Sequence, residues 1–394
     1  MRALTRYACW EYLKIFLVIL AGMTVFLLLI VVIREAIREG FGLVTILQFI
    51  PYVLPVSMRL SIPAAALLAA SVVYGRMAGD NEIVAVKSLG ISPMGMIVPS
   101  LIIAFIISLA AVGINDLAVW WGNPGMNRVL LASVEPIAYG MLRTQRSYSS
   151  DRFSINVKRV DGDWLILPTF TVYGDKGEEE LEISAKKARL RSSADGDRLT
   201  VELIDAAIDG PEGSEVVSPG VFEWDIPLTA AVNQAGNNSA SDYALSELPL
   251  ETQRQGERIK KLERILAAQA SYDIITGNFD RFYSPKWDQR HKDLGDSSYR
   301  LNRLRLEPWR RWANGFSCLA FVVVGVPLSI RLRNSDFITS FFICFLPILV
   351  IYYPLFEYGV GRAKDGTMPP YAVWLGNIIC LVVGGLMLRQ VTRH

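Results

Sequence analysis

The stretch IFLVILAGMTVFLLLIVVI, residues Ile15–Ile33, carries no charged side chain over its whole length. A helix needs about 20 mostly apolar residues to cross the hydrocarbon core of a membrane, and this stretch approaches that length. Arg34 ends it, and the A-x-A cleavage pattern of a secretory signal is not found nearby. We therefore predict that the stretch is a retained membrane-spanning helix.

Five further apolar segments are similar to the first in length and composition. They fall at Tyr52–Tyr74, Met94–Ile114, Trp312–Ile330, Phe337–Phe356 and Tyr371–Leu388. Hydrophobic residues make up 52% of the chain and charged residues 20%, and the mean hydropathy is +0.31, a balance too apolar for an ordinary soluble protein. The sequence thus predicts an α-helical integral membrane protein with six transmembrane helices, three in each half.

The polar region between the two groups of helices predicts an inserted all-β domain, with a sandwich or jellyroll-like fold. Its alternating segments, separated by turn-forming residues, are Phe153–Val160, Trp164–Tyr173, Leu181–Leu190, Arg198–Ile208, Glu215–Val217 and Val221–Ile226. A linker follows at 230–241 and a charged helix at 250–270. The predicted organisation is a first transmembrane half at 1–121, a β domain at 122–228, a polar linker and helical extension at 229–308, and a second transmembrane half at 309–394.

The distribution of basic residues predicts the orientation in the membrane. Cytoplasmic loops carry an excess of Lys and Arg. With both termini in the cytoplasm, the two short outer loops hold Arg34, Arg38, Arg362 and Lys364. The inner segments then hold a larger set, Arg2, Arg6, Lys14, Arg76, Lys87, Arg331, Arg333, Arg389 and Arg393. We therefore expect both termini to be cytoplasmic and the β domain to lie outside the cytoplasm.

Composition and motifs exclude several classes of function. Lys and Arg total 40 against 38 Asp and Glu, so the net charge of +2 gives no basis for nucleic-acid binding. The four cysteines show no C-x-x-C spacing and there are two histidines, so neither a disulfide framework nor a metal site is indicated. The sequence also lacks the phosphate-loop, G-x-S-x-G and H-E-x-x-H motifs, so the chain is not expected to hold ATP itself.

The segment DNEIVAVKSLG, between the second and third spans, predicts a short cytoplasmic helix at about 80–90. Asp80 is suited to cap such a helix, Glu82 to its first turn and Gly90 to its end. A helix of two or three turns has too little apolar surface to fold alone and must rest on the membrane, the span ends or another protein. A structural elbow and a docking site for a cytoplasmic motor subunit both fit this pattern.

Four motifs together resemble one family. Arg6-Tyr7 with Glu11-Tyr12-Leu13-Lys14, the segment Tyr74–Ser92, Gly325–Ser329, and Pro369-Pro370 with Trp374–Asn377 are similar, in order and spacing, to the LptF/LptG (YjgP/YjgQ) permeases of lipopolysaccharide export. The N-terminal pattern and Pro327-Leu328-Ser329 are closer to LptF. The region at 230–298 is longer and more polar than this family leads us to expect.

The resemblance implies a non-catalytic permease subunit of an ATP-driven ABC transporter in the inner membrane of a Gram-negative cell. It implies a second LptF/LptG-type permease, a dimeric cytoplasmic LptB-like ATPase that uses ATP and Mg, and periplasmic jellyroll bridge proteins like LptC and LptA. The substrate would be lipopolysaccharide, drawn from among membrane lipids, and this chain itself would bind no cofactor. The short helix would be the coupling helix, with Asp80, Glu82, Ile83, Val86 and Gly90 forming the ATPase contact.

Basic residues near the predicted outer membrane surface are candidates for substrate contact. Arg34 and Arg38 lie one turn apart and share a helix face, and Arg59 is the one charge inside the second span. Each could instead extend its charged end toward lipid headgroups. A cluster of arginines at 300–311 could likewise pair with Glu307 and headgroups, or bind a polyanionic glycolipid.

Two other functions fit the residues without the resemblance. One is a membrane-anchored scaffold whose β domain binds a periplasmic partner. The other is a membrane transferase that acts on lipid precursors.

Overall fold

The computed structural model describes residues 2–39, 43–126, 128–129, 139–140, 142–143, 146–149, 153–173, 179–192, 198–209, 215–227, 239–332 and 337–393. Contacts divide the chain into two compact units. The bundle unit comprises Met1–Leu27, Leu54–Gly122 and Ser239–His394. The β unit comprises Leu28–Val53 and Asn123–Asn238.

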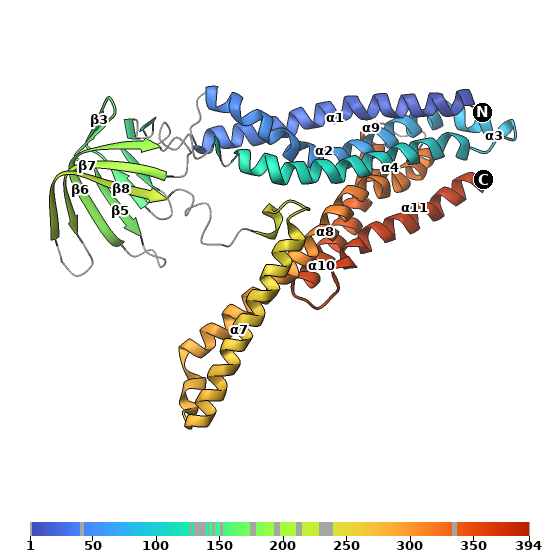
Figure 1. The fold of residues 1–394 in the computed structure, drawn as a ribbon. Coiled ribbons are helices and arrows are strands. Elements are labelled where there is room, and N and C mark those ends of the chain that lie inside the picture. Colours follow the sequence, from blue (N-terminus) through green and yellow to red (C-terminus); the bar gives the residue numbers. More distant parts are fainter. Residues whose placement is uncertain are drawn as a thin grey trace. The chain divides into compact units, whose positions relative to one another are not determined.

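Long helices account for all six predicted spans (Figure 1). In the first half they are α1 (Arg2–Glu39), α2 (Leu43–Gly79) and α4 (Met94–Leu117), which continues into the π turn η1 (Ala118–Gly122); α3 (Glu82–Ser88) is the short helix between α2 and α4. In the second half they are α8 (Pro285–Arg331), then α9 (Phe337–Pro347), η4 (Ile348–Tyr352) and α10 (Tyr353–Lys364) as one span, then η5 (Pro370–Trp374) and α11 (Leu375–Arg393). Within the described residues, six helical segments are long and apolar enough to cross a membrane, which confirms the predicted fold class.

The inserted domain is one antiparallel sheet with a half-barrel form (Figure 1). Its strands are β1 (Ser147–Ser149), β2 (Phe153–Asn156), β3 (Arg159–Asp161), β4 (Trp164–Ile166), β5 (Thr169–Tyr173), β6 (Glu179–Ser192), β7 (Arg198–Asp209) and β8 (Glu215–Pro227). The long strand β6 pairs with β4 and β5 along one edge and with β7 along the other, and β8 pairs with β7. Alternate residues such as Ile183 and Ala185 on β6, and Val201 and Leu203 on β7, are buried on one face.

The strand boundaries differ from the predicted ones at three places, and β1 falls outside every predicted strand. The predicted strand Phe153–Val160 is divided into β2 and β3. The predicted strand Trp164–Tyr173 is divided into β4 and β5 at Leu167-Pro168, because proline has no N–H to donate to the ladder. The predicted short strands at 215–217 and 221–226 are instead one strand, β8, which bends at Gly220, where φ is +107°.

A bulge at Asp205 on β7 faces this bend in β8. Asp205 has a φ of +54°, its carboxylate accepts a hydrogen bond from the Gly220 amide at 3.2 Å, and the register shifts between Ile204 and Ala206. The Lys186 ammonium lies 2.9 Å from the same carboxylate. These hydrogen bonds, that from Lys186 above all, lower the pKa of Asp205 below its ordinary value.

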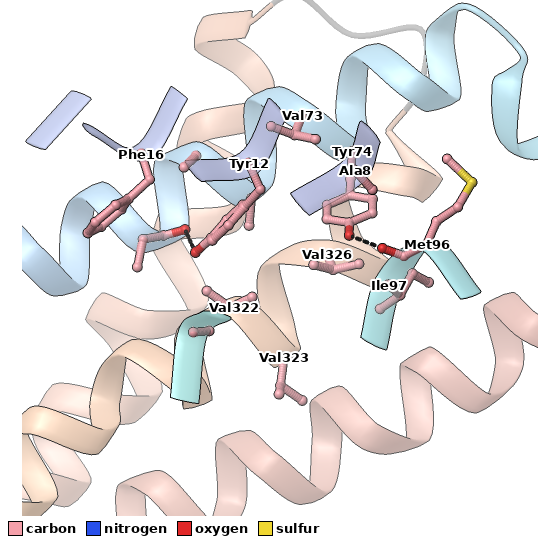
Figure 2. Close-up of a cluster of buried hydrophobic side chains, with 14 of the residues drawn as sticks. Ala8, Tyr12, Phe16, Val73, Tyr74, Met96, Ile97, Val322, Val323 and Val326 are labelled. Atoms are coloured by element: carbon pink, nitrogen blue, oxygen red, sulfur yellow. Dashed lines mark hydrogen bonds between the residues drawn. The ribbon is translucent and has the colours of Figure 1, made fainter. Parts of the chain in front are cut away.

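A core of small and aromatic side chains holds α1, α2, α4 and α8 together (Figure 2). The hydroxyl of Tyr12 on α1 donates to the carbonyl of Ala66 at 3.3 Å. Tyr74 on α2 donates toward the carbonyl of Met96 at 2.9 Å and lies 2.8 Å from the hydroxyl of Ser100, both on α4. Each buried phenol therefore finds a partner on the facing helix, as the low dielectric of the interior requires.

Glycines allow the closest helix approaches in the bundle unit. A Cβ on Gly315 of α8 would lie 3.0 Å from the backbone nitrogen of Val112 on α4. A Cβ on Gly384 of α11 would lie 2.7 Å from the carbonyl oxygen of Val323 on α8. Small residues at such crossings bring helices into close van der Waals contact in membranes, so α8 is fixed against both α4 and α11.

A helical hairpin precedes the fourth span in the bundle unit (Figure 1). It consists of α7 (Leu248–Thr276), the short η3 (Phe279–Tyr283) and the N-terminal part of α8. The predicted charged helix at 250–270 is thus confirmed as part of α7. Helix α8 is continuous from the hairpin into the membrane span. Most of the predicted linker at 230–241 lies outside the described residues, apart from its last three, which belong to Ser239 and η2 (Ala240–Asp242).

Candidate substrate and coupling sites

Arg34 and Arg38 lie near the C-terminal end of α1, in the part of the helix that belongs to the β unit. The Arg34 side chain is exposed. Beside it, Val32 packs with Phe49 and Val53 of α2 in a small apolar cluster, which fixes this end of α1. The Arg38 backbone is helical, and its side chain lies outside the described part of the structure.

Arg59 is half-buried on α2, in the bundle unit. Its charge interacts electrostatically with Arg310, Glu307 and Arg311 of α8, so the second span lies close to the arginine cluster at this position. No hydrogen bond or ion pair links Arg59 to any residue that the structure describes. Intramembrane charges usually face a bundle interior or a cavity, so Arg59 stays a candidate for substrate contact, and contact with lipid headgroups stays open beside it.

The neighbouring arginines Arg310 and Arg311, by contrast, already form ion pairs with carboxylates of this chain. Arg310 donates two hydrogen bonds to the Glu307 carboxylate, of 2.6 and 2.8 Å. The Arg311 side chain is 1% exposed, and it donates to Glu307 at 3.1 Å and to Asp116 of α4 at 2.8 Å. A buried guanidinium of this kind needs every donor satisfied, and these contacts supply anionic partners on two helices.

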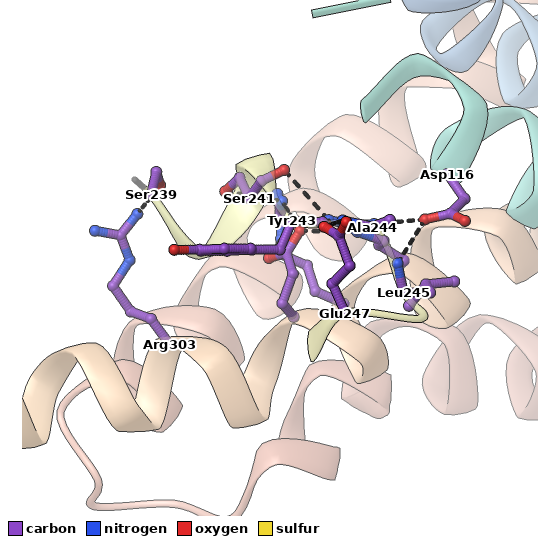
Figure 3. Close-up of polar contacts among 11 residues, drawn as sticks. Asp116, Ser239, Ser241, Tyr243, Ala244, Leu245, Glu247 and Arg303 are labelled. Atoms are coloured by element: carbon purple, nitrogen blue, oxygen red, sulfur yellow. Dashed lines mark hydrogen bonds and ion pairs between the residues drawn. The ribbon is translucent and has the colours of Figure 1, made fainter. Parts of the chain in front are cut away.

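The same arginines hold the chain where it re-enters the bundle unit after the β domain (Figure 3). Arg311 also donates to the carbonyls of Ser241 at 3.2 Å and Tyr243 at 2.6 Å. Arg303 donates to the Ser239 hydroxyl at 2.6 Å. On the other side, Asp116 accepts the Leu245 amide at 2.9 Å. Residues 239–245, which we call the return segment, are therefore tied to both α4 and α8.

The sequence left open whether the arginines at 300–311 pair with Glu307 and lipid headgroups or bind a glycolipid, and these contacts answer part of that question. Pairing with Glu307 is confirmed for Arg310 and Arg311. Anchoring of the return segment was not anticipated, because nothing in the local sequence links residues 239–245 to a helix some 60 residues further on. Asp116 offered a signal, since a carboxylate that ends an apolar span requires a cationic partner.

The predicted coupling helix exists as α3, shorter than expected. It spans Glu82–Ser88, with Glu82 in its first turn and Lys87 in its last, and Gly90 follows with a φ of +74°. The expected capping role of Asp80 is wrong. Asn81, at a φ of 59°, occupies the N-cap position without a side-chain cap, and Asp80 lies exposed in the preceding turn.

The face of α3 that points outward is also not the predicted one. Ile83 and Val86 are 4% and 7% exposed and pack in the core of α1, α2, α4 and α8. Both side chains are therefore already packed within this chain, which favours other residues of α3 for an ATPase contact; the contact itself stays a prediction. The apolar residues left exposed at this end are Val84 and Leu89, at 48% and 74%.

Polar contacts join α3 and its surroundings to both halves of the bundle unit. The Lys87 ammonium donates to the carbonyl of Val391, near the end of α11, at 2.7 Å. Arg76, at the end of α2, pairs with Glu11 of α1 at 3.0 Å. An open cavity of about 600 Å³ lies beside α3, lined by Val84, Lys87 and Arg331 among others.

Comparison with known families identifies the family of the chain. The chain matches the family described as lipopolysaccharide export system permease LptF/LptG over residues 6–390. The chain belongs to this family. A comparison with curated proteins finds no match.

Membership accounts for the architecture of this LptF/LptG permease as a whole. The match covers both sets of spans and the inserted β domain, so the predicted fold and the predicted transport role are confirmed together. The family is one of permeases, so the predicted role as a permease subunit of lipopolysaccharide export is confirmed. The scaffold and transferase alternatives are set aside on the same ground.

Proposed function

We propose that this LptF/LptG permease is the LptF-type half of a permease pair that extracts lipopolysaccharide from the outer leaflet of the inner membrane. The charge distribution of its short loops supports cytoplasmic termini and a periplasmic β domain. In this arrangement the β domain passes lipopolysaccharide to periplasmic jellyroll proteins like LptC and LptA. The half-barrel offers the free edge of β8, on a long strand that pairs only with β7 among the described strands, for such an addition.

The observation that carries the substrate assignment is the free charge of Arg59. Arg310 and Arg311 are paired with Glu307 and Asp116, whereas Arg59, the charge inside the second span, has no such partner among the described residues and can take a further anion. Lipid A carries phosphate groups, and a guanidinium binds phosphate through two parallel hydrogen bonds. Arg34 and Arg38 on α1 are proposed as further phosphate contacts.

The coupling proposal rests on the position of α3. A dimeric cytoplasmic LptB-like ATPase, which uses ATP and Mg, would receive the outward face with Val84, Ala85 and Leu89, while Glu82 lies at the edge of the contact. Because Ile83 and Val86 are packed into the core and Lys87 holds α11, a force on α3 is passed to both halves of the permease. Asp80 and Gly90 then shape the turns on either side of the contact.

Substitution of Arg59 tests the substrate assignment. A photoreactive residue at the exposed Leu60 position should crosslink lipopolysaccharide, and Arg59→Gln should lower the yield about tenfold, since a charge-assisted hydrogen bond contributes roughly 1.5 to 3 kcal/mol. Arg59→Lys should retain part of the yield because it keeps the charge. The matched control is Arg305→Gln, which removes an exposed arginine of α8. Equal crosslinking in wild type and Arg59→Gln would overturn the assignment.

A further inference from the structure

The hairpin of α7 and α8 takes no part in the sites above, and its outer end has a distinct chemistry. Residues that face the partner helix follow a spacing of three and four along α7, the pattern of an antiparallel coiled coil. Ile259, Leu262 and Leu266 form the apolar part of this seam, with Ile259 9% exposed. The next two seam positions are polar, Gln269 and Asp273.

This change of polarity opens a groove between the helices. Around Ala268 the seam lacks the large aliphatic side chains that would close the gap, and an open cavity of about 600 Å³ lies between α7, η3 and α8. Its volume is that of a typical small-molecule site. Most of the side chains that line it are polar or charged, among them Gln269, Asp273 and Arg290, which argues against an aliphatic lipid chain as the ligand.

The groove holds more positive charge than the hairpin uses. Arg281 is paired with Asp273 at 3.1 Å. Lys286 and Arg290, at the start of α8, also line the groove, and neither makes a hydrogen bond or ion pair with a described residue. The groove therefore presents two cations that are free to meet an anionic group.

An unsatisfied acceptor and two aromatic rings complete the lining. The Gln269 side-chain oxygen is buried and has no hydrogen-bond donor among the described residues. A buried acceptor without a donor costs about 1 to 3 kcal/mol, so it favours a ligand that brings a hydroxyl or amide hydrogen. Trp287 is held edge-to-face against Phe282 at 4.9 Å, and Tyr272 lies on the opposite helix.

We propose that this groove binds an anionic saccharide. Phosphate or carboxylate groups would meet Lys286 and Arg290, and sugar hydroxyls would donate to Gln269. The apolar face of a sugar ring would pack on the rigid indole of Trp287. An acidic peptide would satisfy the cations but would leave the combination of ring and hydroxyl donors unused.

Two sources of such a saccharide exist in the compartment proposed for the hairpin. One is the phosphorylated core oligosaccharide of lipopolysaccharide, and the other is the cell-wall glycan with its carboxylates. The groove is separate in the fold from Arg59, so its ligand binding does not depend on transport.

Calorimetric titration of the full-length permease in nanodiscs of phosphatidylcholine tests the proposal. The probes are a phosphorylated core oligosaccharide freed of lipid A, the same oligosaccharide after dephosphorylation, a disaccharide muropeptide and a decamer of glutamate. We expect one of the two anionic saccharides to bind, and the tighter one identifies the source. The dephosphorylated oligosaccharide should bind at least tenfold more weakly than its phosphorylated form if the core is that source.

Paired variants separate a binding role from a structural one. Lys286→Gln with Arg290→Gln should weaken binding at least tenfold, while the matched control Lys260→Gln with Lys261→Gln, on the exposed face of α7, should not. Gln269→Leu extends the apolar seam, so it should weaken binding without lowering the melting temperature. Binding of neither saccharide, equal loss in the control pair, or tighter binding of the glutamate decamer would each overturn the proposal. Arg59→Gln should leave this titration unchanged, which separates its outcome from that of the transport assignment.

Discussion

The single arginines of α1, α2 and α8 fall into two physical classes. Arg311 is 1% exposed and bound by carboxylates and carbonyls on three sides, so it has no capacity left for a ligand. Arg59 and Arg34 have charge to offer, the first because its neighbours are mutually neutralised and the second because it is exposed. Burial and pairing, which the sequence does not show, therefore separate structural arginines from candidate substrate contacts.

Arg34 and Arg38 should contribute unequally to substrate capture. We expect Arg34→Ala to lower both export and the crosslinking of lipopolysaccharide at the end of α1. Arg34→Lys should retain part of each, since Lys keeps the charge and loses the planar fork. Arg38→Ala should have a smaller effect than Arg34→Ala. Basal ATPase activity should be preserved. Crosslinking yield and export rate check this. Unchanged values in the Arg34→Ala, Arg38→Ala double mutant would leave headgroup contact as the role of the pair.

Arg311 should be required for stability and not for substrate contact. Arg311→Met leaves Asp116 without its cationic partner and the carbonyls of Ser241 and Tyr243 without the guanidinium donor, and loss of one partner from a buried ion pair costs about 3 to 5 kcal/mol. We expect a lower melting temperature and faster proteolysis of the return segment. Arg305→Met, which removes an exposed arginine from the same helix, should change neither. Wild-type protease resistance in Arg311→Met would show that the return segment is held by other contacts.

Among the elements, α3 shows where sequence reasoning succeeds and where it stops. Its existence, the acidic first turn and the glycine at its end followed from residue types at Glu82 and Gly90. Its buried face did not, because a helix of two turns has no hydrophobic period long enough to show which side meets the bundle. Ile83 and Val86 are apolar, and so is Val84; tertiary packing alone decides among them.

The two faces of α3 should give opposite results when changed. Leu89→Asp or Val84→Asp should abolish co-purification of the ATPase while the permease stays folded, because both side chains are exposed. Ile83→Asp should instead unfold this end of the bundle, since it buries a charge in the core. Reversal of Glu82 to Lys should weaken the complex less than Leu89→Asp. Full ATPase recovery with Leu89→Asp and Val84→Asp together would refute docking through this face.

In the β domain, too, the local sequence pattern predicts where elements lie but not the contacts that depend on tertiary structure. Alternating residues identified the strand regions from Phe153 onward, including β6 and β7 to within a few residues, and missed the short strand β1. The joining of residues 215–227 into one strand depends on the bulge at Asp205 of the neighbouring strand, a contact between positions that are remote in sequence. Pattern alone therefore located the strands but not the bends between them.

For the whole molecule, orientation in the membrane is a prediction with a direct test. In a background without native cysteines, an impermeant thiol reagent should label Ser271→Cys on the hairpin in intact spheroplasts and should not label Ser88→Cys on α3. Both positions are exposed, so differences in labelling report the side of the membrane and not burial. Permeabilised cells, in which both should react, provide the control. Labelling of Ser88→Cys alone would invert the topology and refute the proposed periplasmic position of the β domain.

At this scale the sequence was a reliable guide to composition and order. Three spans, a β insertion, a charged helix and three further spans could be predicted because each rests on a local pattern of apolar residues. The network around Arg311 and the groove beside Gln269 could not, since each needs two segments whose pairing is set by the fold.

The close approach of α8 to α4 at Gly315 gives α8 the geometry of a lever. At a rise of about 1.5 Å per residue, the arm from Gly315 to Pro285 at the hairpin tip is about 45 Å long, and the arm to Arg331 at the other end is about 24 Å. A rigid helix that pivoted there would roughly double a sideways displacement between its ends, and Pro308, within the longer arm, is the position where such a helix would bend. Small movements produced beside α3 would thus reach the hairpin tip amplified and reversed in direction.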